Sequence, residues 1–311
     1  MRTLGKLPSR HRITRLLAAL CLSSVAGVVT LPAHAQDYQL KDVVPARLVY
    51  GASKFLISVE TEVTQNVMSA EAAKTDLLAA GRDEGLAASE EGVFKINLSS
   101  SILGTRSSFD AWLNPDGAIL QRTSLYTGHK DWYRNFRYFE GGAYSIKRKP
   151  HNSQEEGRPW SEWSEVNEDR YIVSEKAAGV TLSEAEAIFY LVNVANLKKP
   201  GDVAVQHLFD TDGTITVTMT VADIVPLEVD FKEFTTNGER HVEETLDAVH
   251  IRIACAPFDP TANTENFKFL GYKGDIDFYI DPVRRVMIRA TGKIDYIGTV
   301  EINLKEADFR S

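Results

Sequence analysis

Cysteine is the residue that this sequence has least of: only Cys21 and Cys255 occur among 311 residues. Cys21 lies in an N-terminal segment that we expect to be removed on export, so the exported chain keeps one thiol and forms no internal disulfide bond. We therefore expect that the fold is stabilised by a hydrophobic core, for which the chain is long enough.

The sequence also lacks the short motifs of common enzyme classes. It contains no Gly-x-Ser-x-Gly nucleophile motif, no His-Glu-x-x-His zinc motif and no glycine-rich phosphate loop. We predict no catalytic residues, no cofactor and no metal ligands, and an enzyme is the least favoured class. Carboxylates are abundant, however, so a glycan-acting hydrolase whose acid pair is assembled by the fold stays an alternative.

The first 35 residues have the pattern of a cleaved export signal. Basic residues precede the mainly apolar run Leu16–Leu31, and Ala33-His34-Ala35 has the small-x-small form of a cleavage site. We predict cleavage after Ala35, which leaves residues 36–311 as one β-rich periplasmic domain. Residues 1–35 hold five basic and no acidic residues, so their removal changes the net charge from −8 to −13. This charge argues against nucleic-acid binding, and no later run is long and apolar enough to span a membrane.

Alternating apolar and polar residues predict strands over most of the exported chain. The sequence Asn114-Pro115-Asp116-Gly117 is a strong turn, and Ile119–Tyr126 returns from it as a hairpin partner. Successive strands of this kind predict a mainly β fold, a curved antiparallel meander in the form of a half-barrel or open barrel. Residues 68–92 are rich in Ala and Glu and interrupt the pattern. We interpret them as a surface insertion with weak helices, and the alternative is a mobile lid over a cavity.

One principal α-helix is predicted from Thr181 to Asp202. Thr181 and Glu184 have the spacing of a capping box, and Pro200-Gly201 ends the pattern. Apolar residues recur between them at spacings of three and four, so that one stripe of the helix is apolar. We expect this stripe to plug or flank the concave side of the sheet.

These features together resemble a known family. The Trp112–Gly117 turn is followed by a basic and aromatic meander, then by Tyr190-Leu191 leading to Pro200-Gly201-Asp202, and the chain closes on a strand with Tyr296, Gly298 and Leu304. The chain resembles the bacterial envelope family catalogued as domain of unknown function 3108. The resemblance implies a periplasmic β-rich protein with a curved sheet broadly like the lipoprotein-carrier folds, and it implies no catalytic residues. Residues 68–92 and 234–246 depart from the family pattern.

The segment Ile119–Pro150 carries the candidate site. It holds seven basic and two acidic residues, and seven aromatic residues accompany them. On a strand, Trp132, Arg134, Phe136 and Tyr138 would share one face, and Tyr133, Arg137 and Phe139 the other. Basic side chains beside aromatic faces suit an anionic amphiphile or a sugar acid; the alternative is an ordinary sheet whose long side chains cover apolar neighbours. The predicted ligand-binding residues are Arg122, Tyr126, Trp132, Arg134, Phe136, Arg137, Tyr138, Trp160 and Trp163.

The function predicted from the sequence is that of a soluble periplasmic binding or carrier protein. Its ligand would be an apolar or anionic cell-envelope molecule: a lipid, a lipid-linked precursor or a glycan. The first alternative is a non-catalytic structural adaptor of an envelope assembly, which would bind an envelope protein rather than a small ligand. A deep aromatic-lined concavity would favour the carrier, and a filled core with an exposed apolar patch would favour the adaptor.

Overall fold

Strands dominate the computed structural model, which describes residues 38–54, 57–102, 104–128, 130–295 and 297–310. The described strands are β1 (Ala46–Lys54), β2 (Ile57–Met68), β3 (Val93–Ile102), β4 (Thr105–Leu113), β5 (Ile119–Thr127), β6 (Trp132–Phe139), β7 (Gly142–Lys149), β8 (Glu165–Ile172), β9 (Leu182–Ser183), β10 (Val203–Leu208), β11 (Ile215–Thr235), β12 (Gly238–Pro257), β13 (Lys273–Asp281), β14 (Val286–Ile294) and β15 (Gly298–Asp308). The α-helices are α1 (Ala70–Asp76) and α2 (Ala187–Val194). Single 3₁₀ turns lie at Leu40–Asp42, Trp160–Glu162, Glu175–Ala177 and Thr264–Asn266. The predicted export segment, residues 1–35, and Tyr296 of the predicted closing strand lie outside the described residues.

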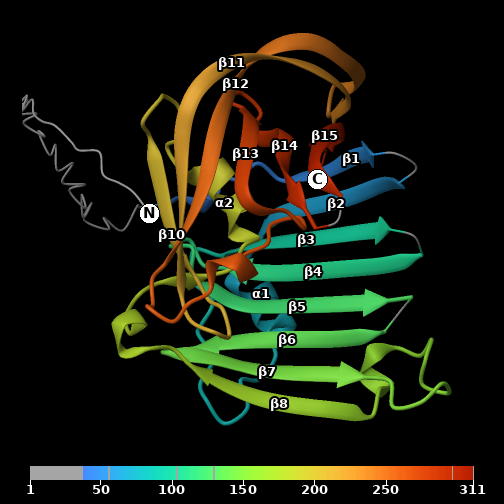
Figure 1. Cartoon of the computed structure of the whole chain (residues 1–311), viewed down its shortest axis with the longest axis vertical. Helices are drawn as coiled ribbons and strands as arrows, with labels where there is room; N and C mark the ends of the chain where they lie inside the picture. The colour runs from blue at the N-terminus through green and yellow to red at the C-terminus, as the bar shows by residue number, and fades with distance from the viewer. Residues whose placement is uncertain (1–37, 55–56, 103, 129, 296, 311) are drawn as a thin grey trace, which may run out of the picture. The chain divides into compact units, whose positions relative to one another are not determined.

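All fifteen strands belong to one sheet. Its order is β8-β7-β6-β5-β4-β3-β2-β1-β15-β14-β13-β12-β11-β10-β9, and nearly every neighbouring pair is antiparallel. The prediction of a mainly β, curved antiparallel meander is confirmed. We call β1–β8, which lie side by side in Figure 1, the open strands.

Strands β11–β15 close into a ring, which the sequence pattern does not show. Residues 232–234 of β11 pair in parallel with residues 306–308 of β15, so β11–β15 form a closed circuit. The closure depends on the long hairpin β11–β12. Its ladder begins where Ile215 pairs with Pro257 and ends where Thr235 pairs with Gly238, and the hairpin arches over β13 and β14 in Figure 1. A register shift between Val221 and Asp223 interrupts the ladder, and such bulges increase the local bend of a strand.

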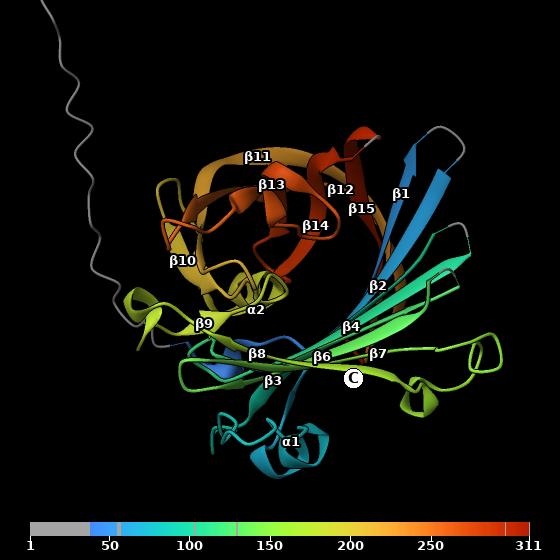
Figure 2. The same ribbon diagram turned by 60° about the horizontal axis from the view of Figure 1, so that its bottom comes forward.

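The helix α2 lies on the concave side of the sheet, as predicted. All of its residues from Ala187 to Asn193 are buried. The ring of Tyr190 lies 5.0 Å from that of Phe94 on β3, and the ring of Phe189 lies 5.3 Å from that of Phe269. We call the face of the open strands that packs against α2 the concave face, and the other the opposite face; Figure 2 shows α2 and α1 on these two sides.

The predicted extent of this helix, residues 181–202, is wrong. Leu182 and Ser183 form β9, which pairs in parallel with β10, and α2 begins only at Ala187 with no side-chain cap. The expected capping box does not form because Glu184 instead contacts Tyr138 and Arg122 of the open strands. Tertiary contacts override local helix propensity here. At the other end, the backbone is already extended at Ala195.

The insertion, residues 68–92, packs on the opposite face of the open strands and so does not cover the concave face. Its helix α1 buries Ala73 against Trp112 and Leu120. The guanidinium of Arg137 holds the rest of the insertion by donating to the carbonyl oxygens of Leu78 at 3.0 Å and of Leu86 at 2.7 Å. These contacts favour the interpretation of a surface insertion over that of a lid. Across the described part of the chain, neither helix is long and apolar enough to cross a bilayer.

Candidate functional site

Six of the nine predicted ligand-binding residues lie together on the concave face. The register of β5 and β6 pairs Arg122 with Phe136 and Tyr126 with Trp132, which puts both pairs on one face. Arg134 and Tyr138 follow on the same face of β6 because side chains alternate along a strand. The site therefore includes Arg122, Tyr126, Trp132, Arg134, Phe136 and Tyr138.

The other three predicted residues lie elsewhere and serve packing. Arg137 is on the opposite face, buried under the insertion. The ring of Trp160 stacks on Tyr133, which also belongs to that face, with centroids 3.7 Å apart. Trp163 is only 2% exposed, and its indole N–H donates to the carbonyl oxygen of Glu155 at 3.1 Å. We do not include these three residues in the candidate site.

The outer part of the site is a strip of half-buried aromatic and basic side chains, which we call the aromatic–cation strip: Phe109, Tyr126, Trp132, Arg134 and Lys147. The rings of Tyr126 and Trp132 are stacked with centroids 4.4 Å apart, and Phe109 meets Tyr126 edge-on at 5.6 Å. The ammonium of Lys147 lies 5.5 Å from the centre of the Trp132 ring. The strip thus offers an aromatic surface and two cations to the same solvent-accessible face.

Two cations of the strip lie directly opposite each other. Arg134 on β6 and Lys147 on β7 are cross-strand partners, an arrangement that is destabilising for like charges. Arg134 donates to the hydroxyls of Ser145 at 2.9 Å and Tyr171 at 2.8 Å. Within the described ranges, neither Arg134 nor Lys147 forms an ion pair with a carboxylate. Burial, together with the charges of Lys149 and Arg134, lowers the pKa of Lys147, which Glu165 and Asp169 only partly oppose.

The inner part of the site is a buried ionic cluster: Arg122, Tyr138, Glu184 and Glu186. An Nη atom of Arg122 lies 3.1 Å from a carboxylate oxygen of Glu186, and its Nε lies 3.9 Å from Glu184. The hydroxyl of Tyr138 donates to Glu184. Burial opposes the charge of Arg122, but Glu186 and Glu184 outweigh it and raise the pKa of the guanidinium.

Glu184 is the titratable group in this cluster whose state can change near neutral pH. Burial raises the pKa of Glu184 to about 7; Arg122 opposes this increase, and Glu186 adds to it. A carboxyl in such an environment exchanges a proton near neutrality, which is a common property of functional sites.

A small cavity of about 220 Å³ opens beside the cluster, lined in part by Arg122, Phe136, Glu184, Phe209 and Asp210. The ring of Phe209 meets Tyr138 edge-on at 5.5 Å and Phe136 at 5.8 Å. Burial also raises the pKa of Asp210. The cavity therefore combines aromatic walls, one guanidinium and two carboxyl groups that resist ionisation.

The sequence pattern does not indicate several residues of this site. It predicts Glu184 as part of a helix cap, and Phe209, Tyr171 and Asp210 come from segments outside β5 and β6. Only the fold brings them together. The turn at Ala185 and Glu186, directly before α2, brings the two carboxylates to Arg122, and the sequence pattern does not indicate this turn.

Comparison of the chain with protein-family models, with curated proteins and with solved structures found no match. The resemblance to the envelope family named above therefore stays a prediction.

Proposed function

We propose that this protein is an exported binding protein whose ligand is an anionic amphiphile or an anionic glycan of the cell envelope. The observation that carries the proposal is the cross-strand pair Arg134–Lys147, two cations without a carboxylate partner in the described part of the chain, placed beside the stacked rings of Tyr126 and Trp132. Like charges at such positions destabilise a sheet, and an anion bound between them would relieve the repulsion.

In this proposal, each part of the strip contacts a different part of the ligand. The anionic group would lie against Arg134 and Lys147, because charge-assisted hydrogen bonds to guanidinium and ammonium groups are the strong ones. The hydrocarbon or sugar portion would lie on Trp132 and Tyr126, whose rings offer flat, half-exposed surfaces.

The ligand would lie on the concave face rather than inside the ring of β11–β15. Side chains from the ring strands, α2 and the loop after β12 fill that interior as one continuous cluster of buried residues, which includes Phe189, Phe269 and Phe278. The cavity beside Arg122, at about 220 Å³, is smaller than the usual site of a drug-sized ligand. We therefore propose surface binding along the aromatic–cation strip.

A titration with dodecyl phosphate tests this proposal. The wild-type chain should bind it with a change in tryptophan fluorescence, to which Trp132 contributes. Arg134→Gln with Lys147→Gln should weaken binding at least about tenfold, as expected for two charge-assisted contacts. Lys232→Gln, which removes an exposed cation on β11 far from the strip in the sheet order, is the matched control. Equal affinity in the double variant and the control would refute the proposed site.

A second candidate function, glycan hydrolysis, is favoured by one observation: Glu184 and Asp210 line the same cavity and have raised pKa values. Glycosidases use one carboxylic acid with a raised pKa and a second carboxylate. If this function is correct, envelope glycan fragments are cleaved by the wild type, and Glu184→Gln binds but does not cleave them. Absence of cleavage by the wild type under saturating fragment would eliminate this candidate.

A further inference from the structure

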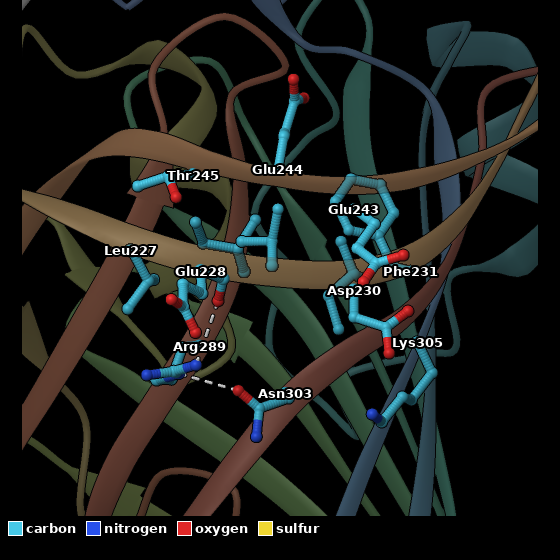
Figure 3. A pocket seen from close by; sticks show the side chains of 13 residues that line it. Leu227, Glu228, Asp230, Phe231, Glu243, Glu244, Thr245, Arg289, Asn303 and Lys305 are labelled. Carbon is cyan, nitrogen blue, oxygen red and sulfur yellow. Dashed lines mark hydrogen bonds between the residues drawn. The ribbon is translucent and has the colours of Figure 1, made fainter.

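The ring of strands has an opening at the place where β14 and β15 separate. β14 pairs with β15 only as far as Arg289 and Asn303, and β11 pairs with β15 only from Glu306 onward. Between these two ladders lies a cavity of about 540 Å³, bordered by β11, β12, β14 and β15. Figure 3 shows it with the β11–β12 hairpin on one side and Arg289, Asn303 and Lys305 on the other.

One wall of this cavity is apolar because buried side chains of the core form it. Leu227, Phe231, Ile288 and Leu304 line it, and each is at most 9% exposed. These side chains belong to the continuous core. An occupant with a hydrocarbon portion would therefore meet the edge of the core.

The rim on the β11–β12 side is acidic. Asp230 and Glu243 are direct cross-strand partners, and Figure 3 shows their side chains close together at the rim. Glu228 also lines the cavity, two residues before Asp230 on the same strand. Across the described ranges, neither Glu228 nor Glu243 forms an ion pair through its carboxylate, and Asp230 pairs with the exposed His241 at 2.7 Å.

The basic residues on the other side do not neutralise this rim. Arg289 is already paired with a carboxylate, because its Nε lies 3.6 Å from Glu301. Its Nε also donates to the side chain of Asn303 at 2.8 Å, and its Nη2 donates to the carbonyl oxygen of Glu228 at 3.3 Å.

Lys305 is the second basic residue on this side. Four acidic residues line the cavity, because Glu244 lies beside Glu243 and pairs with Arg284 at 3.8 Å, so acidic residues outnumber basic ones. The charge complement of this rim is a cation, and the apolar residues that line the same cavity favour a cation with a hydrocarbon portion.

We propose that this cavity is a second ligand site and that it binds an alkylammonium compound. The ammonium group would lie against Asp230 and Glu243, and the alkyl chain would enter along Leu227 and Ile288. A cation at this position would reduce the electrostatic repulsion between the two carboxylates, which face each other across the strands. The site has a charge preference opposite to that of the aromatic–cation strip and is independent of it.

Calorimetric titration with octylammonium chloride tests the proposal, with sodium octanoate as the ligand of opposite charge. The wild type should bind octylammonium at least ten times more tightly than octanoate. Asp230→Asn with Glu243→Gln should reduce octylammonium affinity at least fivefold. These residues are exposed, so the variant should retain the fold.

The control variant is Glu239→Gln with Asp247→Asn. It removes two exposed carboxylates of β12 that do not line the cavity. This variant should bind octylammonium as the wild type does. Equal binding of octanoate, absence of octylammonium binding, or an equal loss in the control variant would each overturn the proposal. The last result would show that only the general negative charge of the hairpin attracts the cation.

Discussion

Replacement of Glu184 by Gln should make the protein less sensitive to pH. Burial raises the pKa of Glu184 from 4.5 to about 7 in the folded state. The folded state therefore binds more protons than the unfolded state between these two values, and the free energy of unfolding falls as pH rises through this window. Gln has nearly the shape of the neutral acid but cannot ionise, so the variant should lack this contribution.

The size of the effect follows from the difference between the two pKa values. Each unit corresponds to about 1.4 kcal/mol, so Glu184 should lower the stability of the wild type by about 3 kcal/mol when the pH rises from about 4 to about 8.5. The side chain of Glu184 is only 13% exposed, so solvent screens this effect little. Groups far from Glu184 titrate over the same range, but they contribute equally to both proteins and cancel in the difference.

Urea denaturation of the two proteins at a series of pH values measures this difference. Near pH 4 the two free energies of unfolding should differ by a constant offset. As the pH rises, the free energy of unfolding of the variant should increase relative to that of the wild type, by about 3 kcal/mol in total. The midpoint of this increase should lie between pH 4.5 and about 7. Parallel curves across the whole range would show that Glu184 titrates normally in the folded protein and would refute the description of the buried cluster.

Three further predictions concern packing and processing. Arg137→Lys should lower the free energy of unfolding by about 2–4 kcal/mol in urea denaturation, because carbonyl oxygens of Leu78, Leu86 and Leu120 lose their donors; a loss no larger than that of exposed Arg106→Lys would contradict this. Asn135→Leu should raise the free energy of unfolding by about 1 kcal/mol, because no described residue forms a hydrogen bond with either amide atom of this buried side chain. A clearly lower free energy of unfolding would contradict this. The intact mass of protein recovered from the periplasm should lack residues 1–35, and an uncleaved mass would exclude the predicted signal.

The alternation of side chains predicts much of the fold. It correctly assigns Trp132, Arg134 and Phe136 to one face of β6 and Arg137 to the other, because the two-residue period of a strand is a local property. It does not predict that β11 and β15 meet, since that contact joins segments about seventy residues apart and leaves no periodic trace. The helix fails for a related reason: the local capping signal of Glu184 competes with Arg122 and Tyr138, which only the fold brings near.

The candidate site is predictable only in its outer part. Trp132, Arg134 and Lys147 lie in one basic and aromatic segment, so composition reveals them. Charge in the sequence, however, does not reveal which cations are neutralised. Arg122 pairs with Glu186, and Arg137 is bound by carbonyl oxygens, whereas Arg134 and Lys147 face each other. The distinction between structural and available cations therefore requires the three-dimensional arrangement.

Native mass spectrometry tests the central claim, ligand binding on the concave face, most directly. Protein would be purified gently from the periplasm and measured before and after organic extraction, with Arg134→Ala and Lys232→Ala measured beside the wild type. We predict a bound mass on the wild type and on Lys232→Ala that extraction removes, and a much smaller bound fraction on Arg134→Ala. A ligand-free wild type, or equal retention by both variants, would contradict the proposed site.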